Sequence, residues 1–429
     1  MKTLSTSLHL SAALVFGSTP VPALQNITLL AGCLTNMVFS LPPPLTALVV
    51  GLASAAFGLL VGTLRSDAAS ATAVPLLVNV SEVNVKQLRM AASSIGVFRL
   101  AADSVDVKAA LEASRIFFAL PDAVKRSAKS ATGVGGFKRG YIPLAGESGL
   151  RDYVELKEGF CYGAEPDGKE STATSPNTTT ESNGLKLLLS PNAWPGEHER
   201  ALGPAWVPTM LRHLHACEAL SNQLLRALSV AMGHDAGFLG ALATGGEPIS
   251  LMRLFHYFPN TTAPHVAPGS PRIGSSPHSD WHLLTIVVQD TTGGLQVRRP
   301  DAAEWIDVPA EPGEIVIILG DYLSAISNGS FVSPVHRVLL PPPPTERFSF
   351  TYFRYPQYGA LVPAESARRA QQRALRNARR RQRKLGSRAA EAFNTIIRVT
   401  EGTGLEQLAT TPFGDLLLHK WLGVAANKV

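Results

Sequence analysis

The spacing of hydrophobic residues along the chain changes at Ile249. Before it, a short apolar run beginning at Val74 is followed by segments whose apolar residues recur at helical spacing. These segments predict helices from Val85 to Ser94, from Asp106 to Ala119 and, as the longest, from Trp206 to Met232. This part of the chain is therefore predicted to be an α/β lobe with a long supporting helix.

Short β-branched runs separated by glycine and proline occupy the chain from Ile249 to Tyr355. Short, evenly spaced strands joined by turn residues are typical of antiparallel sandwiches and barrels. The predicted strands have the sequences SLMRLFHYF, LLTIVVQD, GLQVRR, EIVIILGD and FSFTYFRY. Beyond Pro363 the pattern becomes helical again, and a last apolar segment runs from Thr411 to Val424.

The start of the chain is almost uncharged, because between Thr3 and Leu64 only His9 can carry a charge. Its residues 45–64 form an apolar run of 20 residues, about the length that crosses the ~30 Å hydrocarbon core of a bilayer. An acid-free leader is also typical of a cleaved signal or transit peptide. We therefore expect an intracellular protein that is membrane-anchored through residues 45–64 or targeted to an organelle.

Composition excludes several classes of protein. A chain of 429 residues with 45% hydrophobic and 17% charged residues can bury a sizeable core, so it is not disordered as a whole. Cys33, Cys161 and Cys217 are too few and too scattered for a disulfide framework, and no CxxC pair offers zinc two thiolates. The folded body is expected to be reduced.

The net charge of +6 is local. Ten basic residues and no acid lie between Arg368 and Arg388, and the remaining 29 basic and 33 acidic residues leave a net charge of −4. This basic segment has the composition of a solvated helix that could face the phosphates of lipid or RNA. Because it lacks aromatic residues for base stacking, nucleic acid is an unlikely partner, and an exposed helix without a partner is the favoured interpretation.

His278 and Asp280 are separated by one residue in the segment PHSDWHLLTIVVQD. On a strand, side chains two residues apart leave the same face, so this imidazole and carboxylate would converge. The segment SPVHRV supplies His336 as a third ligand from a neighbouring strand. Two histidines and one carboxylate leave coordination positions open, which suits iron(II) oxygenases better than structural zinc sites.

An isolated His-x-Asp is more often a pair of surface residues, but further motifs follow it in a fixed order. They are GGLQV at Gly293, PGE at Pro312, LGD at Leu319, SNG at Ser327, His336-Arg337 and RFS at Arg347. With them, from Val74 to Tyr355, the chain resembles the non-haem iron(II)/2-oxoglutarate-dependent dioxygenases, in the branch similar to isopenicillin N synthase. The resemblance implies an α+β fold: a double-stranded β-helix (jelly-roll, cupin-like) core with flanking helices and an N-terminal α/β lobe.

Arg347 and Ser349 alternate along one strand, so a guanidinium and a hydroxyl lie side by side. A planar guanidinium can bind a carboxylate through two parallel hydrogen bonds, and the hydroxyl can donate a third. In the family this pair holds the distal carboxylate of 2-oxoglutarate, and Tyr257 matches a tyrosine that also reaches the cosubstrate. The alternatives are a surface ion pair for Arg347 and a core role for Tyr257.

Four positions depart from the family pattern. Ser279 replaces a threonine, Phe255 and Ile318 replace asparagines, and His282 replaces a glycine. His282 shares the predicted strand face of the metal ligands, and we expect it to be exposed at the rim rather than to contact substrate or crowd the metal.

The resemblance predicts an oxidoreductase, an iron(II)- and 2-oxoglutarate-dependent dioxygenase that hydroxylates or desaturates a small organic substrate. It would bind Fe(2+), consume O2 and release succinate and CO2, with ascorbate as a reductant. Two alternatives stay open. One is an isopenicillin N synthase-like oxidase that does not use 2-oxoglutarate, and the other is an inactive membrane-tethered binding module.

The predicted organisation has six parts. They are a targeting or anchor segment (1–70), an N-terminal dioxygenase lobe (74–165), a Ser/Thr-rich surface loop (166–185), a helical support (186–246), the iron/2-oxoglutarate jelly-roll core (247–357), and a basic helix with the C-terminal tail (358–429).

Overall fold

The computed structural model describes residues 74–77, 83–102, 104–128, 137–144, 146, 153–164, 184–196, 202–246, 248–259, 271–299, 304–385 and 405–426. The uncharged start of the chain, including the apolar run 45–64, lies outside the described residues, as does most of the predicted loop 166–185. Among the described residues, no helix is both long enough and apolar enough to cross a membrane.

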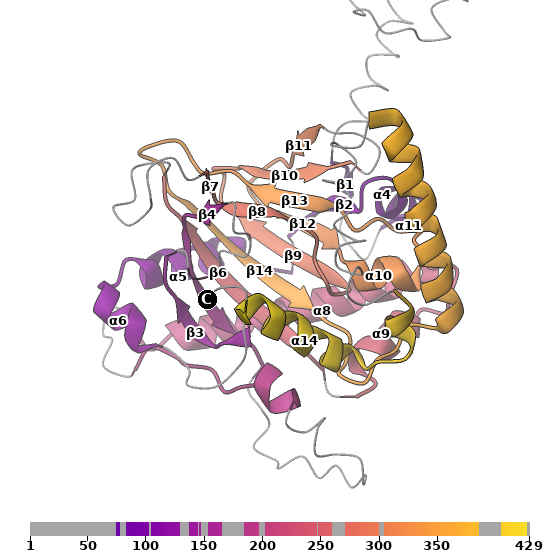
Figure 1. Ribbon diagram of the computed structural model, residues 1–429. Helices are drawn as coiled ribbons and strands as arrows, with labels where there is room; N and C mark the ends of the chain where they lie inside the picture. Colours follow the sequence, from indigo (N-terminus) through magenta and orange to yellow (C-terminus); the bar gives the residue numbers. More distant parts are fainter. Residues whose placement is uncertain are drawn as a thin grey trace, which may run out of the picture. The chain divides into compact units, whose positions relative to one another are not determined.

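Eight strands form the larger of two main sheets, in the order β1-β2-β12-β9-β14-β6-β5-β3 (Figure 1). Neighbouring strands are antiparallel, except that β1 runs parallel to β2. The strands are β1 (Leu76–Leu77), β2 (Val97–Ala101), β3 (Gly140–Ile142), β5 (Lys157–Tyr162), β6 (Ser250–Tyr257), β9 (Leu284–Gln289), β12 (Glu314–Leu319) and β14 (Arg347–Arg354). The four central strands fall on β-branched runs predicted from the sequence.

The N-terminal strands do not build a sheet of their own. Strands β1 and β2 extend one edge of the larger sheet and β3 and β5 extend the other. Strands of two to six residues bury too little surface to be stable alone, so they pair with the longer strands of the barrel. The N-terminal part of the chain therefore helps to build the jelly roll.

The smaller sheet has the order β11-β10-β13-β8 and packs against one face of the larger sheet. Its strands are β8 (Ser275–His278), β10 (Leu295–Arg298), β11 (Trp305–Asp307) and β13 (Val335–Val338). Phe255, Val287 and Val316 of the larger sheet meet Val297 and Val338 of the smaller one in a buried apolar layer. Strands β4 (Val154–Glu155) and β7 (Arg272–Ile273) form a separate parallel pair. Two facing, mainly antiparallel sheets are the jelly roll that the resemblance implies.

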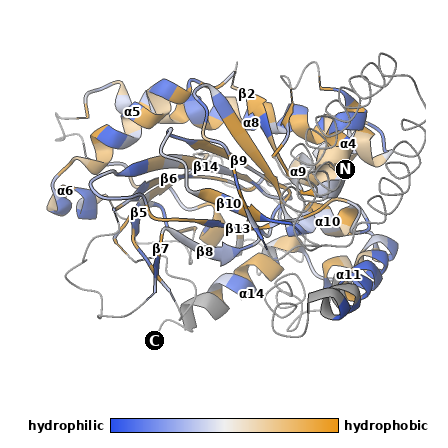
Figure 2. Ribbon diagram, turned by 90° about the horizontal axis from the view of Figure 1, so that it is seen from above, coloured by the Kyte–Doolittle hydropathy of each residue, from blue (hydrophilic) through white to orange (hydrophobic). Residues whose placement is uncertain are grey.

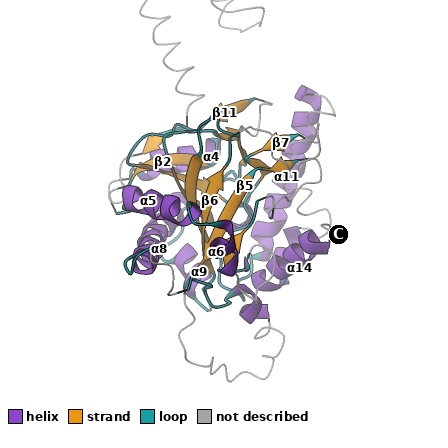
Figure 3. Ribbon diagram, turned by 90° about the vertical axis from the view of Figure 1, so that its left-hand side faces the viewer, coloured by secondary structure: helices purple, strands orange, loops and turns teal. Residues whose placement is uncertain are grey.

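Helices cover the other face of the larger sheet. The longest, α8 (Trp206–Met232), has the bounds predicted from its apolar spacing, and Gly233 at its C-terminal end has a φ of 88°. It packs with α4 (Val85–Ser94) and α5 (Val107–Phe118). Figure 2 shows these three helices on one side of the strands, and Figure 3 shows α8 opposite α11 and α14.

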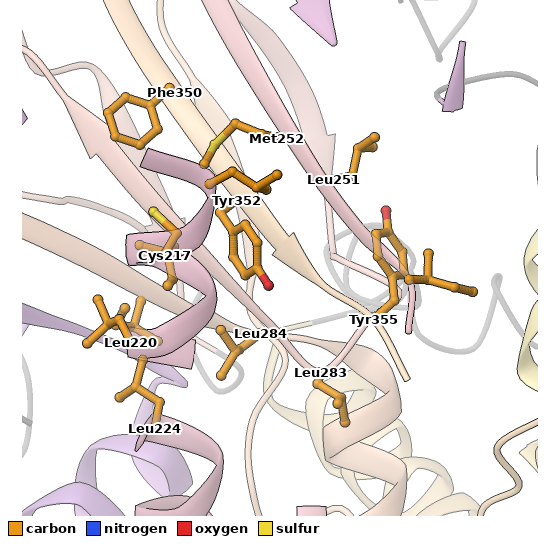
Figure 4. Packing of buried hydrophobic residues seen from close by; sticks show 14 of the residues in the cluster. Cys217, Leu220, Leu224, Leu251, Met252, Leu283, Leu284, Phe350, Tyr352 and Tyr355 are labelled. Carbon is orange, nitrogen blue, oxygen red and sulfur yellow. The ribbon is translucent and has the colours of Figure 1, made fainter. Parts of the chain in front are cut away.

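Strand β9 is buried throughout because its alternate residues pack into two different apolar layers, one on each face of the larger sheet. Leu284, Ile286 and Val288 join the core beneath the helices, whereas Val287 faces the smaller sheet. Figure 4 shows Leu284 and Tyr352 lying close to Cys217, Leu220 and Leu224 of α8.

The C-terminal part is helical, as predicted. It contains α11 (Ala364–Leu385) and α14 (Phe413–Ala426), and α11 contacts the short helix α10 (Asp321–Ile326). Ala367 and Ala370 form the buried side of α11, whereas its described arginines are exposed. The smaller elements are α6 (Asp122–Ser127), α9 (Phe238–Thr244) and the 3-10 helix η3 (Leu405–Ala409).

Candidate functional site

Pairing of β8 with β13 brings the predicted metal ligands together. His336 is in register with His278, the last residue of β8, and Asp280 follows two residues later. The Nε2 atoms of the two histidines lie 3.7 Å (His278) and 3.8 Å (His336) from Oδ1 of Asp280. The three potential ligand atoms lie within 4.8 Å of one another. These separations are too long for hydrogen bonds and leave room for an ion bound about 2 Å from each atom.

Both histidines point Nε2 at this space. Nδ1 of His278 lies 2.7 Å from the carbonyl oxygen of Ser276, and Nδ1 of His336 lies 3.3 Å from that of Pro334. When Nδ1 carries the proton and donates it to these carbonyls, Nε2 is left as an acceptor. Burial lowers the pKa of His336 to about 4, so this imidazole is neutral at neutral pH. The donor set therefore fits a divalent cation.

The Asp280 carboxylate is buried and ionised. Burial raises its pKa, but the charges of His336, His282 and His278 and a hydrogen bond from Thr285 lower it to about 2. The Thr285 hydroxyl donates to Oδ2, and Oδ1 is the oxygen that faces the two candidate ligand histidines. The carboxylate is thus held in one orientation, with one oxygen available to a metal.

The LGD motif supports the backbone beneath this carboxylate. The amide of Asp321 donates to the carbonyl oxygen of Asp280 at 2.7 Å, and the Ser279 hydroxyl donates to Oδ2 of Asp321 at 3.0 Å. A Cβ atom at Gly320 would overlap the carbonyl oxygen of His282. The motif therefore lets two turns approach each other closely behind the site.

The expectation that His282 is exposed at the rim is wrong. Its exposed fraction is 2%, and its ring packs edge-on against Phe353 and Tyr355. Its Nε2 lies 3.1 Å from Oγ1 of Thr285 and 3.6 Å from Oδ2 of Asp280. Strand β8 ends at His278, so strand alternation does not continue to His282, which turns back into the barrel.

Arg347 and Ser349 lie side by side on β14, as predicted, and both are buried. Three acceptors hold the guanidinium: the carbonyl oxygen of Gly293 at 2.6 Å, Oε1 of Gln289 at 2.9 Å and the Ser349 hydroxyl at 3.2 Å. Its Cζ lies 4.5 Å from the ring centre of Tyr257, which is in register with it across β6. Within the described part of the chain, no carboxylate forms an ion pair with Arg347. The interpretation of Arg347 as a surface ion pair is therefore wrong, and a buried guanidinium is left to bind an anion.

Two residues of the site were missed from the sequence, Thr285 and Gln289. Both lie on β9, at alternate positions that face the smaller sheet together with Val287. Gln289 is in register with Ser349. The sequence offered one signal for them, because both are polar residues at inward-facing positions of an otherwise apolar strand.

Comparisons with known proteins agree with this geometry. Residues 248–356 match the family model of the 2OG-Fe(II) oxygenase superfamily. Residues 76–197 match a second family model, described as "non-haem dioxygenase in morphine synthesis N-terminal". The 2-oxoglutarate-dependent dioxygenase citB of Monascus ruber is 30% identical over 273 residues, which are 63% of this chain and 77% of the relative. Homoarginine-6-hydroxylase of Arabidopsis thaliana is 31% identical over 291 residues, 66% of this chain and 80% of the relative.

Solved structures show the same fold. A full-length Neurospora crassa protein in complex with alpha-KG and thymine superposes with a TM-score of 0.53 at 25% identity, covering 68% of this chain and 88% of that protein. A 2OG-Fe(II) oxygenase family protein from Caulobacter crescentus gives a TM-score of 0.52 at 24% identity, covering 67% of this chain and 88% of that protein.

Proposed function

This chain belongs to the non-haem iron(II)/2-oxoglutarate-dependent dioxygenase superfamily, and on that premise we propose that His278, Asp280 and His336 are its iron ligands. The observation that supports this assignment best is the convergence of three potential ligand atoms within 4.8 Å, with no hydrogen bond among them. The buried carboxylate is ionised and the His336 ring is neutral, which are the states that bind a divalent cation.

We also assign the binding of 2-oxoglutarate to Arg347, Ser349 and Tyr257. The Arg347 guanidinium is 1% exposed and has no acid partner among the described residues, so the carboxylate of the cosubstrate would neutralise it. Because Arg347 donates to Ser349, the hydroxyl proton of Ser349 remains available to the same carboxylate. Gln289 and Gly293 orient the guanidinium beforehand, which reduces the cost of ordering it when the cosubstrate binds.

The protein is an oxidoreductase. With iron bound, the site supplies the oxidation of an unreactive C–H bond: a substrate, O2 and 2-oxoglutarate yield the hydroxylated substrate, succinate and CO2. The chain's own side chains bind and orient the cosubstrate, and the apolar walls formed by residues such as Val287, Val297 and Val316 exclude water. Desaturation of the substrate is the second outcome that we propose for the same site.

The superfamily relatives bear names of different substrates, so the substrate is not carried over from them. They include a 1-aminocyclopropane-1-carboxylate oxidase of Dictyostelium discoideum, which is 26% identical over 306 residues. An oxidase that does not consume 2-oxoglutarate is therefore the alternative to test. The match to the 2OG-Fe(II) oxygenase family model and the 30% identity to a relative named as a 2-oxoglutarate-dependent dioxygenase favour the dioxygenase.

One experiment tests the assignment. The full-length protein is supplied with iron(II), ascorbate and 2-oxoglutarate labelled at the carboxyl carbon beside its keto group, and released CO2 and succinate are measured. We expect release without added substrate and its loss in His278→Ala, whereas His215→Ala, at an exposed position on α8, keeps it. Full release by His278→Ala, or none from the iron-loaded wild type, would contradict the proposal.

For residues 1–70 we propose a targeting or membrane-anchoring role. Its support is the sequence alone: one ionisable side chain in 62 residues and an apolar run of 20. Fusing residues 1–70 to a fluorescent protein, and fractionating the cells, tests it. A fusion that stays in the soluble fraction at full length would contradict an anchor and a cleaved leader alike.

A further inference from the structure

A second buried guanidinium lies outside the metal and cosubstrate sites. Arg139, just before β3, is 1% exposed, and its one hydrogen bond within the described part of the chain runs from Nε to the carbonyl oxygen of Ser190 at 3.3 Å. Its Nη1 and Nη2 atoms are buried and have no hydrogen-bond partner among the described residues. The hydroxyl of Ser190, which is also 1% exposed, has none either. Two neighbouring residues, joined by a hydrogen bond, therefore carry three buried donor groups that are unsatisfied among the described residues.

Gly163 and the segment around Ser190 pack closely against the Arg139 guanidinium. A Cβ atom at Gly163 would lie 2.5 Å from Nη2 and 2.6 Å from Nη1, so the guanidinium occupies the space where any other residue would place its side chain. Asn192 fixes Gly163 through two hydrogen bonds, one to its amide at 2.9 Å and one to its carbonyl at 2.8 Å. The end of β5 and the segment that contains Ser190 thus fix the position of the guanidinium.

Comparison with the other deeply buried arginines shows what is missing at Arg139. Arg354 is 0% exposed, and it pairs with Glu218 at 3.2 Å and with Asn222 at 2.9 Å. Arg139 shares with Arg347 the lack of an acid partner among the described residues. Burying a guanidinium without an anion is costly, and this cost is offset when an anion binds. An arginine beside a serine hydroxyl is also the donor set proposed above for the cosubstrate carboxylate.

Side-chain contacts connect the segment around Arg139 to the candidate metal site. Phe137, two residues before Arg139, packs on Tyr355 with ring centres 5.3 Å apart, and Tyr355 packs on His282 at 5.0 Å. Burial raises the pKa of Tyr355, the charge of Asp280 raises it further and the charge of Arg139 lowers it. The Tyr355 hydroxyl is therefore within electrostatic range of both the metal-ligand carboxylate and the Arg139 guanidinium.

We propose that Arg139 and the Ser190 hydroxyl bind a carboxylate of the substrate, so that the substrate is a small organic acid whose apolar body lies along Phe137 and Tyr355. This inference rests on the proposed function, because it places the other end of the acid at the metal. The planar guanidinium would donate to both carboxylate oxygens, and Ser190 would donate a third hydrogen bond.

The test uses full-length protein saturated with Mn(II) and 2-oxoglutarate, so that the Arg347 site is already filled. Acetate, hexanoate and benzoate are titrated beside their neutral amides, and affinity is measured from the shift in melting temperature. We expect at least one acid to bind more tightly than its amide. Arg139→Met should weaken the binding of that acid roughly tenfold or more, as expected for the loss of a charge-assisted pair. The exposed Arg89→Met on α4 should not.

A second measurement separates a binding role from a structural one. Without any added acid, Arg139→Met should melt at the wild-type temperature or above it, because an unpaired buried charge has been removed. Gly163→Ala, which displaces the guanidinium without removing it, should also weaken the binding of the acid. The proposal is overturned if no acid binds better than its amide, if Arg139→Met binds it as wild type does, or if that variant melts lower. Uncoupled CO2 release by the wild type reports on the proposed function separately.

Discussion

The hydroxyl of Thr285 donates a hydrogen bond to one oxygen of Asp280, while the other oxygen of that carboxylate faces His278 and His336. Thr285 lies on β9, the strand that follows the turn holding Asp280, so the position of the oxygen proposed to bind the metal depends on the packing of the barrel. Orientation by a hydrogen-bonding neighbour typically changes metal affinity by roughly 10- to 100-fold.

Replacing Thr285 with valine should therefore weaken metal binding by roughly tenfold or more, because the carboxylate loses its fixed orientation. Calorimetric titration with Mn(II) measures the affinity directly. Thr285→Ser keeps the hydroxyl and should restore most of it, and the exposed Thr244→Val on α9 is the matched control. Equal affinities for the valine and serine variants would argue against this role.

Changing Arg347 to lysine should raise the KM for 2-oxoglutarate by roughly 10- to 100-fold, because an ammonium cannot make the same paired hydrogen bonds. Gln289→Leu removes one acceptor from the guanidinium and should give a smaller increase. Succinate formation at varied 2-oxoglutarate measures both. An unchanged KM in Arg347→Lys would show that Arg347 does not bind the cosubstrate, whereas a wild type that forms no succinate would point to the oxidase that does not use it.

The metal-free protein should lose stability as the pH falls from about 6.5 to about 4. Burial lowers the pKa of His282 and of His336 to about 4, whereas an unfolded histidine titrates near about 6.5. In that window the unfolded chain binds protons that the folded chain does not, so unfolding becomes easier as the pH drops.

Each of these histidines adds a slope of at most about 1.4 kcal/mol per pH unit to the free energy of unfolding. His282→Asn should remove one such contribution, and urea unfolding at several pH values measures the difference. A slope that is identical in wild type and His282→Asn would show that the buried ring does not titrate as described.

Gly320→Ala should destabilise the protein by about 1–3 kcal/mol, because the new Cβ would overlap the carbonyl oxygen of His282. Thermal unfolding measures this change. Gly240→Ala is a control in α9 with nothing within 4 Å of the added atom, and it should be neutral or stabilising. Similar melting temperatures for the two variants would mean that the turn can move apart.

Local patterns were sufficient for the longest helix, the central strands and the candidate ligands. The apolar spacing of α8 defines both of its ends, and a side-chain period of two predicted that Arg347 and Ser349 share a face. His278 and Asp280 converge because only one residue separates them, and His336 was found because its strand motif follows in the expected order. Such features depend on residues close together in the chain, so one sequence reveals them.

The sequence by itself determined the class of fold, the identity of the metal-ligand candidates and the superfamily resemblance. Only the tertiary structure decided that His282 is buried behind Asp280, that Gln289 and Gly293 hold Arg347, and that Arg139 lies unpaired against Gly163. Periodicity specifies which face of an element is buried, but not which distant segment packs against it. Those partners come from strands and loops that sheet pairing brings together. A buried arginine without an acid partner among the described residues, such as Arg139, can therefore be recognised only in the folded structure.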